Sequence, residues 1–226
     1  FIQRLRLQKD KIIICNHGKD SYSKRSFKLN IVFDFGGVVF TWNSKELVAQ
    51  YFSEPEVCNK VHKAIFGHPD WAEVDRGTLS LDEATRNSAE RAGKQFEEIS
   101  RVTYAVPQAL VPIPATIELI KRVKERGHTL FALSNMGIDA MQHLRESYDF
   151  FDLFDHLVIS SEIKMVKPED QIFQYLINTY QLDTRQTIFI DDYAPNIETA
   201  ARFGIQTIHF ASSTQCEAEL IRLGCL

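Results

Sequence analysis

The 226-residue sequence predicts an α/β fold, a doubly wound, Rossmann-like parallel sheet with a small helical cap domain inserted into it. The first observation is an alternation, from residue 114 onward, of short apolar runs with amphipathic helical patterns, which is typical of a parallel sheet covered by helices on both faces. The second is that residues 42–105 interrupt this alternation with helical patterning and are too long for a loop. The core is therefore expected over 29–41 and 106–226, and the cap over 42–105.

The first strand is expected over 29–35, where the apolar run Ile31-Val32-Phe33 leads into Asp34 and then into Gly36 and Gly37. A short apolar run that ends at glycines is typical of a buried strand. Asp34 then stands at the carboxyl end of that strand, where open α/β sheets bind their ligands.

The inserted segment carries signals for several helices. Asn43-Ser44 precedes an apolar helical pattern and fits a helix cap, and Ser80 followed by Glu83 fits a capping box. Trp71 lies in this segment, and we interpret it as an anchor of the cap core, with a place in the substrate pocket as the alternative.

The rest of the chain alternates regularly between the two kinds of element. Gly127 ends the first helix of this region as a C-terminal glycine does. The helices are expected over 115–126, 138–148, 170–180, 196–203 and 215–223, and the strands over 129–133, 156–159, 187–190 and 206–210.

Composition narrows the class of protein. With 44% hydrophobic and 25% charged residues the chain is typical of a soluble globular protein, and its net charge of −4 argues against a general nucleic-acid binder. The apolar runs are far shorter than a membrane span, so no membrane is expected. The cysteines show no CxxC spacing, which favours a reducing, cytoplasmic location: Cys15, Cys58, Cys216 and Cys225.

Residues 1–28 differ from the rest of the chain. They hold eight lysines and arginines against two aspartates, a net charge of +6. We expect a flexible basic tail, and a basic anchoring or targeting arm is the alternative.

Polar groups follow four of the expected strands: Asp34, Ser134, the segment with Lys167, and the pair Asp191-Asp192. In a doubly wound sheet these strand ends meet along one edge. Carboxylates from two strands suit Mg²⁺, which takes one or two carboxylates plus phosphate oxygens. A hydroxyl and an ammonium suit the remaining phosphate oxygens, and a carboxylate near the phosphorus can act as a covalent nucleophile.

This set resembles the haloacid dehalogenase-like hydrolase superfamily, mostly phosphatases with a helical cap, over about residues 30–221. Four motifs match in order, with 100 residues from Asp34 to Ser134, 33 more to Lys167 and 24 more to Asp191. The matching segments are 32–38, 133–135, 166–168, and 190–192 with Asn196.

The resemblance implies a metal site for Mg²⁺. Asp34 would be one ligand, and the backbone carbonyl of Gly36 another. Asp192 would be the main acidic ligand of the fourth motif, with Asp191 beside it, either direct or through water. Asn196 would support that acidic loop.

The resemblance also implies the catalytic and substrate-binding residues. Asp34 would be the nucleophile that forms an aspartyl-phosphate. Ser134, Asn135 and Lys167 would bind the phosphoryl group, and Lys167 would also stabilise charge in the transition state. The expected function is a Mg²⁺-dependent phosphomonoesterase acting on a small phosphorylated metabolite, with sugar phosphates among the candidates.

One departure from the family pattern affects the reaction. Most of these phosphatases carry an aspartate two residues after the nucleophile as general acid and base, whereas this chain has Gly36. A good leaving group, a proton from water or from a cap residue, or weak activity would each account for it. The alternatives are a 2-haloacid dehalogenase that uses Asp34, and a weakly active or non-catalytic binding protein.

Overall fold

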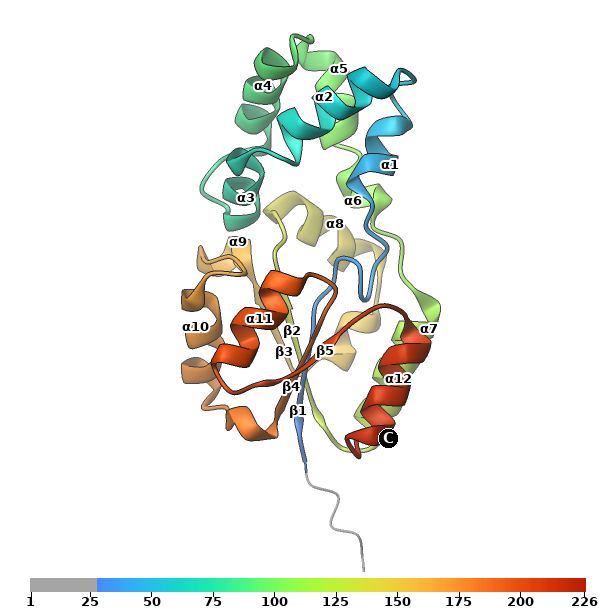
Figure 1. Cartoon of the computed structure of the whole chain (residues 1–226), viewed down its shortest axis with the longest axis vertical. Helices are drawn as coiled ribbons and strands as arrows, with labels where there is room; N and C mark the ends of the chain where they lie inside the picture. Colours follow the sequence, from blue (N-terminus) through green and yellow to red (C-terminus); the bar gives the residue numbers. More distant parts are fainter. Residues whose placement is uncertain (1–27) are drawn as a thin grey trace, which may run out of the picture.

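The computed structural model describes residues 28–226, so the basic tail predicted over 1–28 lies outside the described residues except for Lys28. Five strands form one parallel sheet in the order β3-β2-β1-β4-β5, which confirms the doubly wound α/β fold (Figure 1). The strands are β1 (Asn30–Phe33), β2 (Thr129–Ser134), β3 (His156–Ile159), β4 (Thr187–Asp191) and β5 (Gln206–His209).

The central strand β1 is apolar from Ile31 to Phe33 because it is covered on both faces and paired on both edges. Ile31, Val32 and Phe33 are fully buried. Phe33 pairs with Ala132 of β2 on one side and with Ile190 of β4 on the other. The next amide, that of Asp34, still donates to the Ile190 carbonyl at 2.9 Å. This register brings Asp34 beside the acidic end of β4.

Helices cover both faces of the sheet (Figure 1). The first face carries α7 (Pro114–Glu125), α8 (Ile138–Ser147) and α12 (Ser213–Arg222), and the second carries α10 (Asp170–Tyr180) and α11 (Ala194–Arg202). The short helix α9 (Ser160–Ile163) and the 3₁₀ turns η1 (Phe150–Leu153) and η2 (Thr184–Gln186) complete the layers.

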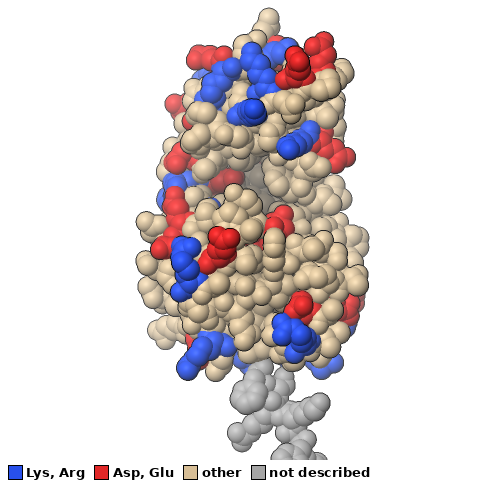
Figure 2. Space-filling model, in the orientation of Figure 1, with Lys and Arg blue, Asp and Glu red and all other residues tan. Residues whose placement is uncertain are grey.

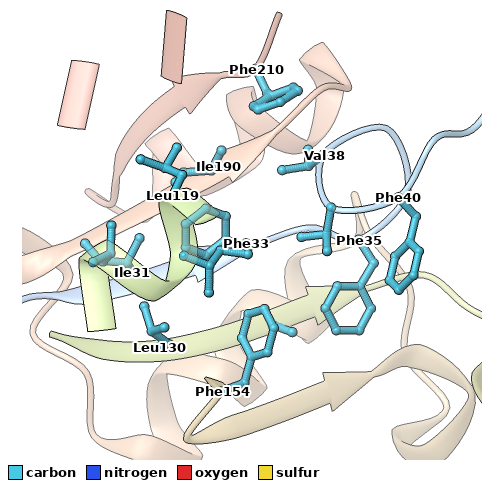
Figure 3. Close-up of a cluster of buried hydrophobic side chains, with 14 of the residues drawn as sticks. Ile31, Phe33, Phe35, Val38, Phe40, Leu119, Leu130, Phe154, Ile190 and Phe210 are labelled. Atoms are coloured by element: carbon cyan, nitrogen blue, oxygen red, sulfur yellow. The ribbon is translucent and has the colours of Figure 1, made fainter. Parts of the chain in front are cut away.

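Aromatic packing on the face of the sheet that carries α7, α8 and α12 fixes the loop after β1 (Figure 3). Phe35 contacts Phe154 edge-on at 5.6 Å between ring centroids, and Phe40 at 5.8 Å. The Gly37 amide donates to the Phe40 carbonyl at 2.8 Å, which closes a tight turn. Buried rings on both sides of the two glycines therefore hold the turn that follows Asp34.

Six helices between β1 and α7 pack around a core of their own. Val48, Val61, Ile65, Ile99 and Val102 are buried in it. In Figure 1 these helices stand apart from the sheet, beyond the carboxyl ends of its strands. They are α1 (Ser44–Ala49), α2 (Pro55–Ile65), α3 (Pro69–Arg76), α4 (Leu81–Ala92), α5 (Phe96–Thr103) and α6 (Val106–Ala109).

Side-chain caps start two of these helices where the sequence predicts them. The Asn43 side chain accepts a hydrogen bond from the Glu46 amide, and the Ser80 hydroxyl accepts one from the Glu83 amide. Each bond satisfies a backbone donor at a helix start. Within residues 28–226, no helix combines the length and the apolar character that crossing a membrane requires.

Candidate active site

A cavity of about 370 Å³ lies between the six-helix cluster and the carboxyl ends of the strands. Figure 2 shows the molecular surface hollowed between these two parts. On the sheet side the cavity is lined by Asp34, Gly36, Lys167 and Asp192. The residues that the sequence places at strand ends thus meet at one opening, as parallel topology requires.

Lys167 lies between two carboxylates at the floor of this cavity. Its ammonium group is 2.9 Å from Asp34 Oδ1 and 2.7 Å from Asp191 Oδ2, and its side chain is only 1% exposed. Burial alone would lower the pKa of Lys167, but the Asp34 and Asp191 carboxylates outweigh it and raise that pKa. The lysine is therefore held in its charged form.

Asp34 has one occupied carboxylate oxygen and one free one. Oδ1 accepts hydrogen bonds from the Phe35 amide at 2.7 Å and from Lys167. Oδ2 receives no hydrogen bond from any residue of the described chain. Burial, more than the nearby Asp191 and Asp192, raises the pKa of Asp34 to about 7, although Lys167 opposes the shift. This geometry leaves Oδ2 available to react or to bind a cation.

Asp191 is fully buried and its carboxylate is saturated with donors. The Tyr193 amide donates to Oδ1 at 2.8 Å, and the Asn196 side-chain amide donates to both oxygens at 3.0 Å. Lys167 donates to Oδ2. Asn196 thus lies where it supports the acidic loop, as expected from its position one turn into α11.

Asp192 completes a cluster in which carboxylate oxygens of Asp34, Asp191 and Asp192 lie within 4.8 Å of one another. Burial first, and then the Asp191 charge, raise the pKa of Asp192. Three carboxylates around one lysine leave excess negative charge, and oxygen donors of this kind fit a hard divalent cation such as Mg²⁺.

Gly37 permits the approach of Asp192 to the loop after β1. A Cβ built on Gly37 would lie 2.1 Å from Asp192 Oδ2. The residue also has φ +76°, a backbone conformation that glycine adopts without steric strain. Any side chain at position 37 would move the Asp192 carboxylate out of the cluster.

The two polar residues after β2 behave differently from each other. Ser134 is buried, and its hydroxyl has no hydrogen-bond partner among the residues that the structure describes. The Asn135 side chain bonds to the backbone of Lys167 twice, donating to its carbonyl and accepting from its amide, each at 2.8 Å. Asn135 therefore positions Lys167, and the phosphate contact expected from the sequence stays a prediction.

The six-helix side of the cavity contains residues that the sequence analysis did not assign to the site. Asp75 of α3 lines the cavity, as do Trp42 and Phe66. Trp71 also lines it, and packs edge-on against Phe66 at 4.6 Å, so it is both an anchor and a wall residue. No spacing pattern marks these side chains, since tertiary packing alone brings them over the strand ends.

Fold and site together define a class, namely doubly wound α/β proteins that gather carboxylates and a lysine at the carboxyl edge of the sheet. Residues 29–204 match the family described as "Hydrolase: haloacid dehalogenase-like hydrolase". The chain belongs to this family, which confirms the resemblance and the expectation of a hydrolase.

Two relatives and one solved structure illustrate the family likeness. The sesquiterpene phosphatase astK of Aspergillus oryzae is 26% identical over 86% of this chain and 96% of that protein. The D-ribitol-5-phosphate phosphatase of Bacteroides thetaiotaomicron is 24% identical over 84% of this chain and 96% of that protein. A haloacid dehalogenase family enzyme from the same bacterium, solved as a magnesium complex, has a TM-score of 0.65 at 22% identity. That likeness covers 86% of this chain and 98% of the other, and at this identity it shows the fold.

Proposed function

We propose that the protein is a Mg²⁺-dependent phosphomonoesterase that works through an aspartyl-phosphate on Asp34. The observation that carries the proposal is the cluster of Asp34, Asp191 and Asp192 around one buried lysine, at the floor of the cavity. A carboxylate with one free oxygen beside a fixed ammonium suits nucleophilic attack on a phosphate ester.

The donor set fits Mg²⁺ in number and in chemistry. Asp34, Asp192 and the Gly36 carbonyl would hold the ion. Asp191 would lie beside Asp192 and contribute its negative charge to the site. Bound Mg²⁺ would offset the repulsion among the carboxylates and draw charge from the phosphoryl oxygens.

The chain's own residues account for the rest of the phosphoryl transfer. Oδ2 of Asp34 is the oxygen that attacks phosphorus, because Oδ1 is held by Lys167 and by the Phe35 amide. Lys167 stabilises the charge that develops on the phosphoryl oxygens. The unpaired Ser134 hydroxyl is the second phosphate donor, and Asn135 keeps Lys167 in register.

The remainder of the cavity favours a hydrocarbon leaving group over a sugar, which was one of the candidates from the sequence. Six of the residues that line the rest of the cavity are apolar: Trp42, Phe66, Trp71, Val74, Val106 and Leu110. Among the polar groups there, Ser44 bonds with His62 at 3.0 Å and Thr103 with Thr85 at 2.9 Å, so the Asp75 carboxylate is the exception. A polyol would leave most of its hydroxyls unpaired against such a wall.

The relatives support phosphate-ester hydrolysis but do not determine which alcohol is the leaving group. One is named for a sesquiterpene and the other for ribitol 5-phosphate, so they share the phosphate and differ in the leaving group. The apolar wall favours the first of these chemistries for this chain. Dehalogenation has no such support, because it leaves the close approach of Asp192 unexplained.

We further propose that residues 42–105 act as a cap that closes over the substrate and excludes water. The cysteine pattern supports a cytoplasmic location, which stays a prediction.

A screen of phosphate release tests this proposal. Monoesters of prenyl alcohols, hexoses and pentitols would be compared with and without Mg²⁺, beside halide release from 2-haloacids. We expect metal-dependent phosphate release, fastest for the prenyl esters, and its loss in Asp34→Asn. The matched control Asp149→Asn changes an exposed aspartate just before η1 and should keep full activity. Metal-independent halide release would contradict the proposal.

A further inference from the structure

We propose that Asp75 of α3 is the general acid and base of the reaction, in place of the side chain that Gly36 does not provide. This inference rests on the proposed phosphatase function. Asp75 lines the same cavity as Asp34 and Lys167, and reaches it from the six-helix side. The leaving-group oxygen points to that side when Asp34 attacks the phosphorus from the sheet side.

The end of α3 that carries Asp75 is fixed on the sheet domain by several contacts. The Asp75 carbonyl accepts a hydrogen bond from the Ser160 hydroxyl at 2.5 Å. Arg76 makes a bidentate pair with Glu169, at 2.9 and 2.6 Å. Lys164 donates to the Gly77 carbonyl at 2.7 Å. A carboxylate on such a tethered turn is held in one place, as proton transfer requires.

The charged groups around Asp75 come from several elements. Lys167 faces it across the cavity, and Asp139 of α8 lines the same cavity. The neighbouring Arg76 is turned toward Glu169, and Lys164 toward Gly77. Burial raises the pKa of Asp75 to about 7, although a backbone hydrogen bond from Gly137 and the charge of Lys167 oppose the shift. A group with such a pKa can both give and take a proton near neutral pH.

Other titratable residues of the cavity fit the role less well. His62 is paired with Ser44, and burial followed by the Lys45 charge lowers its pKa. Asp139 is exposed at the rim, and Tyr193 is 57% exposed. Among the described residues outside the carboxylate–lysine centre, Asp75 alone combines a half-buried carboxylate with a place facing Lys167.

The proposed reaction balances without any further reactant. In the first step Asp34 Oδ2 bonds to phosphorus, the bond from phosphorus to the ester oxygen breaks, and the Asp75 proton passes to that oxygen, which leaves as the alcohol. In the second step a water oxygen bonds to phosphorus and Asp75 takes a proton from that water. The bond to Asp34 breaks, inorganic phosphate leaves, and Asp75 is protonated again.

The test compares Asp75→Asn with wild-type enzyme on two esters, an alkyl phosphate and 4-nitrophenyl phosphate, in Mg²⁺. Alkoxide is a poor leaving group and needs the proton, so kcat/KM for the alkyl ester should fall about 10²- to 10⁴-fold. Nitrophenolate leaves unaided, so the first-turnover burst should stay within a few-fold of wild type. The second step should then slow, so that phosphoenzyme accumulates.

The pH profile gives a second readout. For the alkyl ester, wild-type kcat/KM should fall as pH rises through about 7, because the acid form of Asp75 is lost, and Asp75→Asn should lack this limb. Asp75→Glu should recover part of the rate, and Asp149→Asn should match wild type in both assays.

If Asp75→Asn lost the same fraction of its activity on both esters and kept the wild-type pH profile, Asp75 would have a purely structural role. That result would overturn the inference. The inference would also be overturned if Asp75→Asn hydrolysed the alkyl ester as fast as the wild type does. A wild-type enzyme that releases neither 4-nitrophenol nor phosphate would instead overturn the proposed function itself, so the two failures are distinguishable.

Discussion

At the scale of single residues, Gly37 determines how closely Asp192 approaches the nucleophile loop. Gly37→Ala would place a Cβ 2.1 Å from Asp192 Oδ2 and force that carboxylate away from Asp34. We expect Mg²⁺ affinity, measured by titration calorimetry, to fall about 10- to 100-fold, as is typical when the support of a metal ligand is lost.

The chain offers a matched control for this substitution. Gly127 has φ +84°, close to that of Gly37, but nothing lies within 4 Å of its Cβ position. Both alanine variants should lose about 1 kcal/mol or more of unfolding free energy from backbone strain. Only Gly37→Ala should lose Mg²⁺ affinity, and equal affinity in the two variants would exclude the steric explanation.

Exposed apolar side chains at the cavity rim test the proposed leaving group. Ile138 lines the cavity and is 56% exposed, whereas Ile221 of α12 lies outside it and is 53% exposed. Ile138→Ala should lower kcat/KM for a prenyl phosphate by about 10-fold, since roughly 1–2 kcal/mol of apolar contact is lost. Ile221→Ala should leave kcat/KM unchanged. If Ile138→Ala hydrolysed a sugar phosphate faster than it hydrolysed a prenyl phosphate, the result would count against a hydrocarbon leaving group.

At the scale of elements, α3 is joined to the sheet domain by the pair of Arg76 and Glu169. The pKa of Glu169 is lowered, chiefly by its hydrogen bonds from Arg76. A carboxylate with a lowered folded-state pKa stabilises the fold above its unfolded pKa of about 4.3, and this contribution is lost as pH falls through the folded value.

Glu169→Gln should therefore destabilise the protein at pH near 7 by about 1 kcal/mol or less, because the pair is partly exposed. The difference from wild type should shrink in acid and vanish as pH falls through the lowered folded-state pKa of Glu169. Denaturant unfolding across this range measures the change. Glu162→Gln is the matched control, since Glu162 pairs with Arg145 of α8 rather than with a residue of α3. Faster hydrogen exchange in α3 should accompany only Glu169→Gln.

Elements also differ in how far the sequence predicts them. The strands and their acidic ends follow from apolar runs and parallel topology, so Asp34, Lys167 and Asp191 were expected together and lie together. The expected strand over 29–35 ends at Phe33, because the chain turns into the loop closed by Gly37 and Phe40. The helix expected over 196–203 begins earlier, at Ala194, because Pro195 is tolerated in a first helical turn.

The contribution of the six-helix cluster to the site could not be predicted in the same way. Asp75 and Phe66 reach the cavity only because several helices pack over the carboxyl edge of the sheet. The hydrophobic periodicity of each helix does not indicate that packing. The role of Asn135 was also hidden, since its amide bonds to backbone 32 residues away in the chain.

At the scale of the whole molecule, the carboxylate cluster makes the fold responsive to a cation. Mg²⁺ bound only to the folded state should raise the unfolding free energy by about 2.7 kcal/mol at a concentration of 100 times Kd. Thermal unfolding should therefore shift upward with Mg²⁺ in wild type and much less in Asp192→Asn. An unfolding temperature that does not change with Mg²⁺ concentration would contradict the metal site.

The central claim is that a phosphoryl group passes through Asp34. The most direct measurement is rapid acid quenching of enzyme with substrate in Mg²⁺, followed by mass spectrometry of the peptide that contains Asp34. We predict one added phosphoryl group on Asp34, absent with a chelator and in Asp34→Asn. Release of phosphate at the full rate with no adduct on Asp34, or with the adduct on another residue, would contradict the account.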